Sequence, residues 1–153
     1  MDHGMKAMEL FLSGYNCAQS VAAAFCDVTG LEEKVVVKMV SPFGGGMGRL
    51  REVCGAVSGM LFVLGHLYGY DSNNDDERKK EVYEQVQDLA GQFQAQCGSI
   101  ICRDLLDNPP SDPNPSPRTA QYYKDRPCAR FVVAAAELMD AFIAAHPLEE
   151  HRG

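Results

Sequence analysis

Apolar residues recur at three- and four-residue intervals in nearly every segment, and this periodicity limits the fold more than any other feature of the sequence. In residues 71–98 the apolar positions on this spacing are Val82, Val86, Leu89 and Phe93. Such spacing places them on one face of an amphipathic helix. No segment shows the strict apolar–polar alternation of a half-buried strand. The sequence therefore predicts an all-α fold, a bundle of about five to six helices.

Capping residues and glycines set the expected ends of these helices. Asn16 is the predicted cap of the second helix, and Gly30 closes that segment. Residues 31–40 are rich in β-branched residues and could form a strand, but early acidic residues and Lys38 near the end favour a helix. The expected helices cover residues 4–12, 17–27, 31–40, 52–68, most of 71–98, and 127–145.

Glycines dominate the middle of the chain. Four of the five residues from Gly44 to Gly48 are glycine, so this stretch cannot be regular helix and is expected to be a bend or a loop of close approach. The long central helix that follows contains two glycine pairs, Gly55 with Gly59 and Gly65 with Gly69. Small residues one turn apart allow another core helix to approach closely.

Length and composition predict one domain. The chain has 153 residues, 46% of them hydrophobic, which is enough for one core spanning residues 1–153. Five prolines fall between Asn108 and Pro117 and exclude a helix there. We expect a proline-rich loop at 108–117 that divides the chain without making a second domain, because the segment after it is too small for its own core.

The charge balance disfavours two classes of partner. Fourteen Lys and Arg stand against 21 Asp and Glu, a net charge of −7, and the basic residues form no stripe. Nucleic acid and anionic membrane surfaces are therefore not expected partners. Residues 53–70 carry no formal charge, yet Ser58, His66 and four glycines favour a buried helix over membrane insertion. The first residues lack a secretory pattern, so a cytoplasmic location is expected.

Six cysteines are many for a cytoplasmic chain of this size. A reducing compartment argues against structural disulfides and leaves metal ligation, reactive thiols or core packing. Four of the six fall at predicted helix starts: Cys17, Cys54, Cys102 and Cys128. Unpaired amides and the helix dipole stabilise an anion there, which predicts a lowered thiol pKa and a thiolate available as nucleophile or ligand.

The other two cysteines and two arginines are harder to assign. Cys26 lies on the opposite helix face from Cys17 and is expected to be a core residue. Cys97 stands five residues before Cys102, wider than a CxxC motif, and stays open as a partner or resolving thiol. Arg49 and Arg51 could hold an anion or steady a thiolate, although solvated loop ends are the preferred interpretation.

The order of these motifs resembles a known family. Asn16–Val21, Phe43–Met47, the CGAVSG stretch that begins at Cys54, Cys102 in CRDLL, and Cys128 together resemble the C_GCAxxG_C_C proteins, small bacterial and archaeal proteins described as redox-active. The likeness spans about residues 8–135. It implies that Cys17, Cys54, Cys102 and Cys128 are the functional cysteines, and it favours an iron–sulfur or other metal centre.

Three functions remain open from the sequence. The leading hypothesis is an electron-transfer protein whose four cysteines converge, either as ligands of an iron–sulfur cluster or as a dithiol–disulfide couple with Cys54 as nucleophile. The second is a structural module in which the same thiolates hold zinc. The third is a helical interaction protein, in one version a homodimer, whose cysteines only pack. The sequence names no redox partner and does not decide whether the chain is an enzyme.

Overall fold

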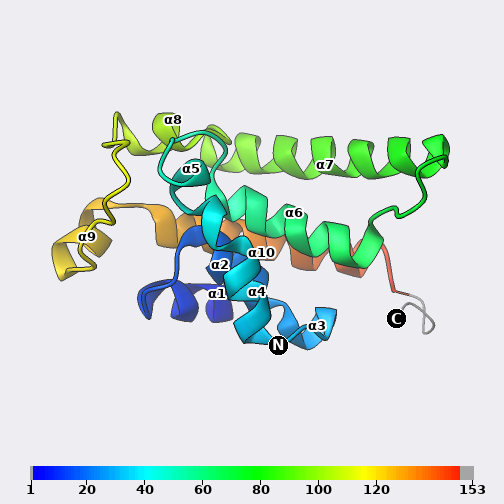
Figure 1. Cartoon of the computed structure of the whole chain (residues 1–153), viewed down its shortest axis with the longest axis horizontal. Coiled ribbons are helices and arrows are strands. Elements are labelled where there is room, and N and C mark those ends of the chain that lie inside the picture. The colour runs from blue at the N-terminus through cyan, green and yellow to red at the C-terminus, as the bar shows by residue number, and fades with distance from the viewer. Residues whose placement is uncertain (1, 149–153) are drawn as a thin grey trace.

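The computed structural model describes residues 2–148 as a mostly helical chain without strands (Figure 1). This confirms the predicted all-α class. Its elements, in chain order, are α1 (His3–Leu12), α2 (Cys17–Ala24), α3 (Cys26–Thr29), α4 (Glu33–Val40), the 3₁₀-helix η1 (Ser41–Phe43), α5 (Gly44–Met47), α6 (Gly55–Tyr68), α7 (Asp76–Cys97), α8 (Cys102–Leu106), α9 (Ala120–Asp125) and α10 (Cys128–Ala145).

The structure divides the chain more finely than predicted, so a bundle of five to six helices is not confirmed as stated. The expected helix over 17–27 breaks at Phe25, which has φ −101° and ψ 14° and separates α2 from α3. Residues 31–40 do form a helix, α4. The segment 107–119 contains no helix, and the short α9 after it was not predicted.

The central helix is shorter than its predicted range of 52–68. It begins at Gly55, because residues 52–54 pair instead with the segment after α7. The amide of Cys54 donates to the carbonyl oxygen of Ile100 at 2.7 Å, and the amide of Cys102 donates to that of Glu52 at 2.6 Å. A long-range backbone pairing therefore takes the place of the first helical turn.

The core lies around α2 and α10, which pack against the other long elements. Helix α2 packs against α1, α4, α6 and α10, while α10 also contacts α1, α6 and α7. The largest fully buried side chains include Phe11, Phe25, Met60, Leu64 and Phe93. Helices α6, α7 and α10 run along the long axis of the molecule, and the starts of α6, α8 and α10 gather at one end of it (Figure 1).

One of the two glycine pairs brings helices into close approach. A Cβ atom on Gly59 would lie 2.6 Å from the carbonyl oxygen of Ala18, and one on Gly55 would lie 3.1 Å from the amide nitrogen of Ala18. The predicted approach of another core helix is thus confirmed for α2 against α6. It is wrong for Gly65, which is exposed with no atom near its Cβ position, and for Gly69, which ends α6.

Among residues 2–148, no helix combines the length and the apolar character that crossing a membrane requires.

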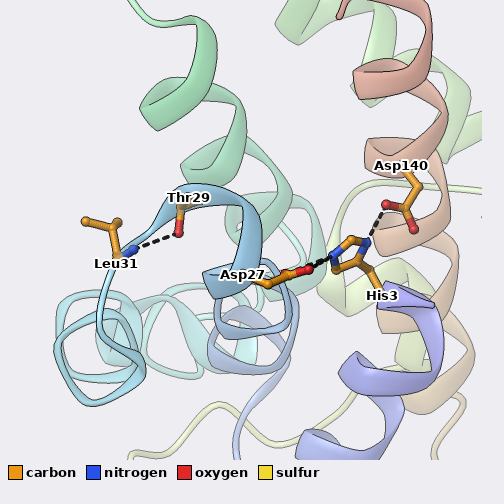
Figure 2. Close-up of polar contacts among 5 residues, drawn as sticks. All are labelled: His3, Asp27, Thr29, Leu31 and Asp140. Carbon is orange, nitrogen blue, oxygen red and sulfur yellow. Dashed lines mark hydrogen bonds and ion pairs between the residues drawn. The ribbon is translucent and has the colours of Figure 1, made fainter. Parts of the chain in front are cut away.

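The buried side chain of His3 joins three helices, α1, α3 and α10 (Figure 2). The Nδ1 atom of His3 in α1 lies 2.6 Å from a carboxylate oxygen of Asp140 in α10, and its Nε2 atom lies 2.9 Å from one of Asp27 in α3. The ring also stacks on Phe25, with centroids 4.2 Å apart. The ring of His3 thus lies between carboxylates of two other helices and links α1 to α3 and α10.

We expect His3→Ala to lower the free energy of unfolding by about 2–4 kcal/mol, because it removes a buried ring and two charge-assisted hydrogen bonds. Urea unfolding followed by circular dichroism measures the change. Met5→Ala, at a 64% exposed position of the same helix, is the control and should stay within about 0.5 kcal/mol of the parent protein. Equal stability of both variants would show that the cluster contributes nothing.

Candidate functional site

Four of the six cysteines line one cavity of about 290 Å³. We call Cys17, Cys54, Cys102 and Cys128 the cavity cysteines. Three of them are the first residues of α2, α8 and α10, and Cys54 is the N-cap of α6, one position before the first turn where the sequence placed it. The structure therefore brings together the four cysteines singled out from the sequence.

Local sequence explains where Cys17 lies. Asn16 and Gln19 form a capping box: the side chain of Asn16 accepts from the amide of Gln19 at 2.9 Å, and that of Gln19 accepts from the amide of Asn16 at 3.0 Å. The amide nitrogen of the Asn16 side chain also donates to the carbonyl oxygen of Ser41 at 3.1 Å. The start of α2 is thereby fixed against η1, the entry to the glycine stretch.

Backbone pairing positions Cys54 relative to Cys102. Val53 and Ile101 form an isolated antiparallel bridge, and each cysteine directly follows a bridge residue. The two segments exchange amide–carbonyl hydrogen bonds, from Cys54 to Ile100 and from Cys102 to Glu52. The separation of these two cysteines is therefore set by main-chain geometry rather than by side-chain packing.

The glycine stretch is not a regular helix, as predicted. Gly45 and Gly46 have φ of 68° and 71°, which an L-residue rarely adopts. A Cβ atom on Gly46 would lie 2.7 Å from the amide nitrogen of Glu52 and 2.8 Å from the Cβ atom of Cys102. The turn consequently packs directly against the residue that carries one cavity thiol.

The four thiols interact with one another electrostatically. Hydrogen bonding with Cys128, and then burial, holds the pKa of Cys17 well above its usual value, and the same hydrogen bond lowers the pKa of Cys128. Negative charge on Cys54 or Cys102 would raise the pKa of Cys17 further. The arrangement favours a thiolate on Cys128 that accepts from the thiol of Cys17.

Burial raises the pKa of the other two cavity cysteines. The pKa of Cys54 rises to about 12, although the amides of Ala56 and Val57 at the start of α6 act in the opposite direction. The pKa of Cys102 also rises through burial, against the effect of Arg51. The prediction that a helix start lowers these pKa values is thus wrong for three cavity cysteines, because desolvation and neighbouring thiols outweigh the helix terminus. The raised pKa of Cys54 disfavours a thiolate there, whereas the pKa of Cys128 is lowered.

Arg51 is not a solvated loop end. Its side chain is buried, with the residue only 3% exposed, and it lines the cavity. Its Nη1 atom donates to the sulfur of Cys102 at 3.6 Å, and its Nε atom donates to the carbonyl oxygen of Pro110 at 2.9 Å. The solvated interpretation preferred from the sequence is therefore wrong here, and the alternative, a cation steadying a thiolate, describes its position.

Arg49 is also held by protein groups rather than by solvent. Its Nε atom donates to the carbonyl oxygen of Asp112 at 2.7 Å, and its Nη1 atom donates to the hydroxyl of Ser116 at 3.1 Å. Together with Arg51 it ties the proline-rich segment to the glycine stretch across the cavity. No motif in either segment predicted that the two would meet.

Sequence reasoning missed two further arginines that line the cavity, Arg118 and Arg126. The guanidinium of Arg118 donates to the carbonyl oxygens of Phe11 and Tyr15 at 3.1 Å and 3.0 Å. Arg126 lies over the ring of Tyr122, 5.0 Å from its centroid, and lowers the pKa of Cys128. The one sequence signal was the position of Arg126, two residues before Cys128. We call Arg49, Arg51, Arg118 and Arg126 the cavity arginines.

The remaining two cysteines lie outside the cavity. Cys26 is partly buried against the core at the start of α3, in line with its expected packing role. Cys97 ends α7, where burial raises its pKa and the charge of Arg130 lowers it. Neither lines the site, so the structure does not place Cys97 as a partner for Cys102 there.

Within residues 2–148, no group of three or more His, Cys, Asp or Glu side chains is arranged to hold a metal ion.

Comparison with known families agrees with the resemblance read from the sequence. A family model described as "Putative redox-active protein (C_GCAxxG_C_C)" matches residues 15–142, a range that includes all four cavity cysteines. No curated protein and no solved structure matches the chain.

Proposed function

The chain belongs to the C_GCAxxG_C_C family, and we propose that it is a redox protein whose four cavity cysteines together form the electron-transfer centre. The observation that carries the proposal is the convergence of all four thiols on one cavity from elements that start at residues 17, 55, 102 and 128. Cysteines that only pack in a core have no physical reason to share one cavity. Two chemical forms of this centre follow, and each rests on a separate observation.

The first form is an iron–sulfur cluster held by the four cavity cysteines. The residues fit such a group, because four cysteine thiolates are the usual ligand set of iron–sulfur clusters and all four cavity cysteines line one cavity. When bound, the cluster would supply one-electron transfer. The chain would supply the thiolates, with Arg51 donating to the sulfur of Cys102 and the cavity arginines offsetting negative charge.

The structural zinc module uses the same four thiolates and stays the alternative to a cluster. Four thiolates leave either centre with net negative charge, which the cavity arginines would offset. Metal and sulfide analysis therefore distinguishes the two.

The second form is a dithiol–disulfide couple, favoured by the interaction between Cys17 and Cys128. The pKa of Cys128 is lowered and that of Cys17 is raised, which is the pairing expected of a nucleophilic thiolate and its proton-holding partner. Formation of the disulfide would remove two electrons from the two sulfurs and release the proton of Cys17. The electrons would pass to a separate redox partner protein.

Either form suits a cytoplasmic protein. A reducing compartment keeps the thiols from forming adventitious disulfides, so they stay available as redox groups or as cluster ligands. All six cysteines are free thiols in the structure. The proposal requires a redox partner, of which the chain gives no identity, and it is compatible with a monomer or a homodimer.

Anaerobic purification followed by visible spectroscopy and iron, sulfide and zinc analysis tests the proposal. We expect iron, sulfide and a visible band that are lost when any cavity cysteine is replaced by serine. The matched control is Cys26→Ser, which should keep both, because Cys26 lies outside the cavity.

Other outcomes separate the alternatives. A colourless protein that loses two thiols reversibly on oxidation, and only when Cys17 and Cys128 are both present, assigns the dithiol couple. One equivalent of zinc without redox response assigns the structural module. If all four serine variants kept the metal, the redox response and the stability of the parent protein, the four-cysteine centre would be wrong.

A further inference from the structure

The cavity carries positive charge that the protein itself does not neutralise. Four arginines line it, and no Asp or Glu of the described residues does. This contrasts with a net charge of −7 for the whole chain. Arg49 alone has a carboxylate within ion-pair distance, that of Asp112 at 3.9 Å, which leaves three arginines without an acidic partner in residues 2–148.

The burial of Arg51 makes the uncompensated charge unfavourable for the stability of the folded protein. The residue is 3% exposed, yet its Nη2 atom is buried without a hydrogen-bond partner. A buried charged donor that lacks a partner costs free energy, on the order of 1–3 kcal/mol or more. Since Nε and Nη1 already have partners, the free Nη2 atom indicates a group that the folded chain does not supply.

The partners of Arg118 and Arg126 are neutral. Arg118 donates to two carbonyl oxygens and to the hydroxyl of Tyr123 at 3.3 Å. The guanidinium of Arg126 contacts the ring of Tyr122 and, in the described part of the chain, has no hydrogen-bond acceptor or carboxylate. Hydrogen bonds to neutral groups orient these side chains but leave their charge uncompensated.

The cavity is also small. About 290 Å³ lies at the lower end of the range for small-molecule sites. This volume accommodates an anion of a few heavy atoms. Planar guanidinium groups match the oxygen pairs of such anions through two parallel hydrogen bonds.

We propose that the side of the cavity formed by Arg51 and Arg126 binds a small inorganic oxyanion next to the cavity cysteines, with Arg118 adding charge. The inference rests on the proposed function in that the anion would be the ligand or reactant brought to the redox centre. Binding itself requires neither a metal nor an oxidation step, so the two proposals can be tested apart.

The test is a calorimetric titration of the full-length, metal-free, reduced protein with sulfate at constant ionic strength, with chloride as the matched salt. We expect one saturable sulfate site. Arg126→Gln should raise the Kd for sulfate by about tenfold or more, because one charge-assisted contact is lost. The control is Arg130→Gln, which removes the same charge from the first turns of α10 outside the cavity and should change the Kd by less than about twofold.

Arg51→Met is expected to abolish binding, but it also removes the hydrogen bond to Pro110, so circular dichroism must show a folded variant. If Arg51→Met does not fold, Arg126→Gln still tests the oxyanion site, because within residues 2–148 the Arg126 side chain makes no hydrogen bond to the backbone that the substitution would remove. Absence of saturable binding, or equal weakening by Arg126→Gln and Arg130→Gln, overturns the oxyanion site. Metal content and redox titration of the same variants report separately on the four-cysteine centre.

Discussion

Gly46→Ala is expected to lower the free energy of unfolding by about 2–5 kcal/mol and to abolish the redox response of the cavity. The φ of 71° costs an L-residue about 1–2 kcal/mol. The new methyl group would also lie within 2.8 Å of the Cα atom of Arg51 and the Cβ atom of Cys102, an overlap that costs a further 1–3 kcal/mol or so. Arg51 and Cys102 lie in the two segments that pair beside the cavity. Relief of the overlap must therefore displace a cavity thiol.

Denaturant unfolding and anaerobic metal or thiol analysis of the same sample measure both effects. Gly65→Ala is the matched control, since Gly65 lies within α6 at an exposed position with no atom near its Cβ site. Alanine there should stabilise the helix by up to about 1 kcal/mol and leave the cavity unchanged. A stable, redox-competent Gly46→Ala protein would contradict the close packing of the glycine stretch on Cys102.

Alkylation of the metal-free, reduced protein by iodoacetamide should separate Cys128 from Cys54 by their pH profiles. The thiolate is the reacting form, so a thiol with a pKa of about 12 has roughly 1000-fold less of it at pH 8 than one with the ordinary value of 9. The rate at Cys54 should still be rising at pH 11. The rate at Cys128 should reach its plateau below the pH of an ordinary cysteine, because its pKa is lowered.

Peptide mapping by mass spectrometry gives the rate for each cysteine, so the faster access to Cys26 and Cys97 does not obscure the comparison. Cys17→Ala removes the group that hydrogen-bonds to Cys128, and the profile of Cys128 should then move to higher pH. An unchanged profile would mean that Cys17 does not hold the proton of this pair. A Cys54 profile at or below that of Cys128 would reverse the assignment of the nucleophile.

The helical class of the chain could be predicted because its signals are local. Periodic apolar residues, the cap at Asn16 and the glycine at residue 30 act within a few residues of where they stand. The late start of the central helix, at Gly55 rather than residue 52, could not be foreseen, because the amide of Cys54 donates to the carbonyl oxygen of Ile100, 46 positions along the chain. Such a bridge has no pattern in either segment alone.

The cavity cysteines could be selected from the sequence, while their electrostatics could not. Three of them do begin helices and Cys54 caps one, which is a local property. Whether a helix start lowers a thiol pKa depends on burial and on which other thiols lie nearby, and these are tertiary properties. The same holds for Arg51, which is buried although its neighbour Leu50 is exposed and its neighbour Glu52 is only partly buried.

The way in which the proline-rich segment is held has a consequence for how this protein can vary. Arg51 and Arg49 grip the segment through the carbonyl oxygens of residues 110 and 112, groups that every amino acid provides, and through the hydroxyl of Ser116. Substitutions in this segment that keep its backbone path should therefore preserve its contacts with the two arginines. The two arginines have no such freedom, because lysine lacks the forked geometry that reaches a carbonyl and a cavity group at once. Among natural variants of this protein, we therefore expect substitutions in the proline-rich segment but none at Arg49 or Arg51.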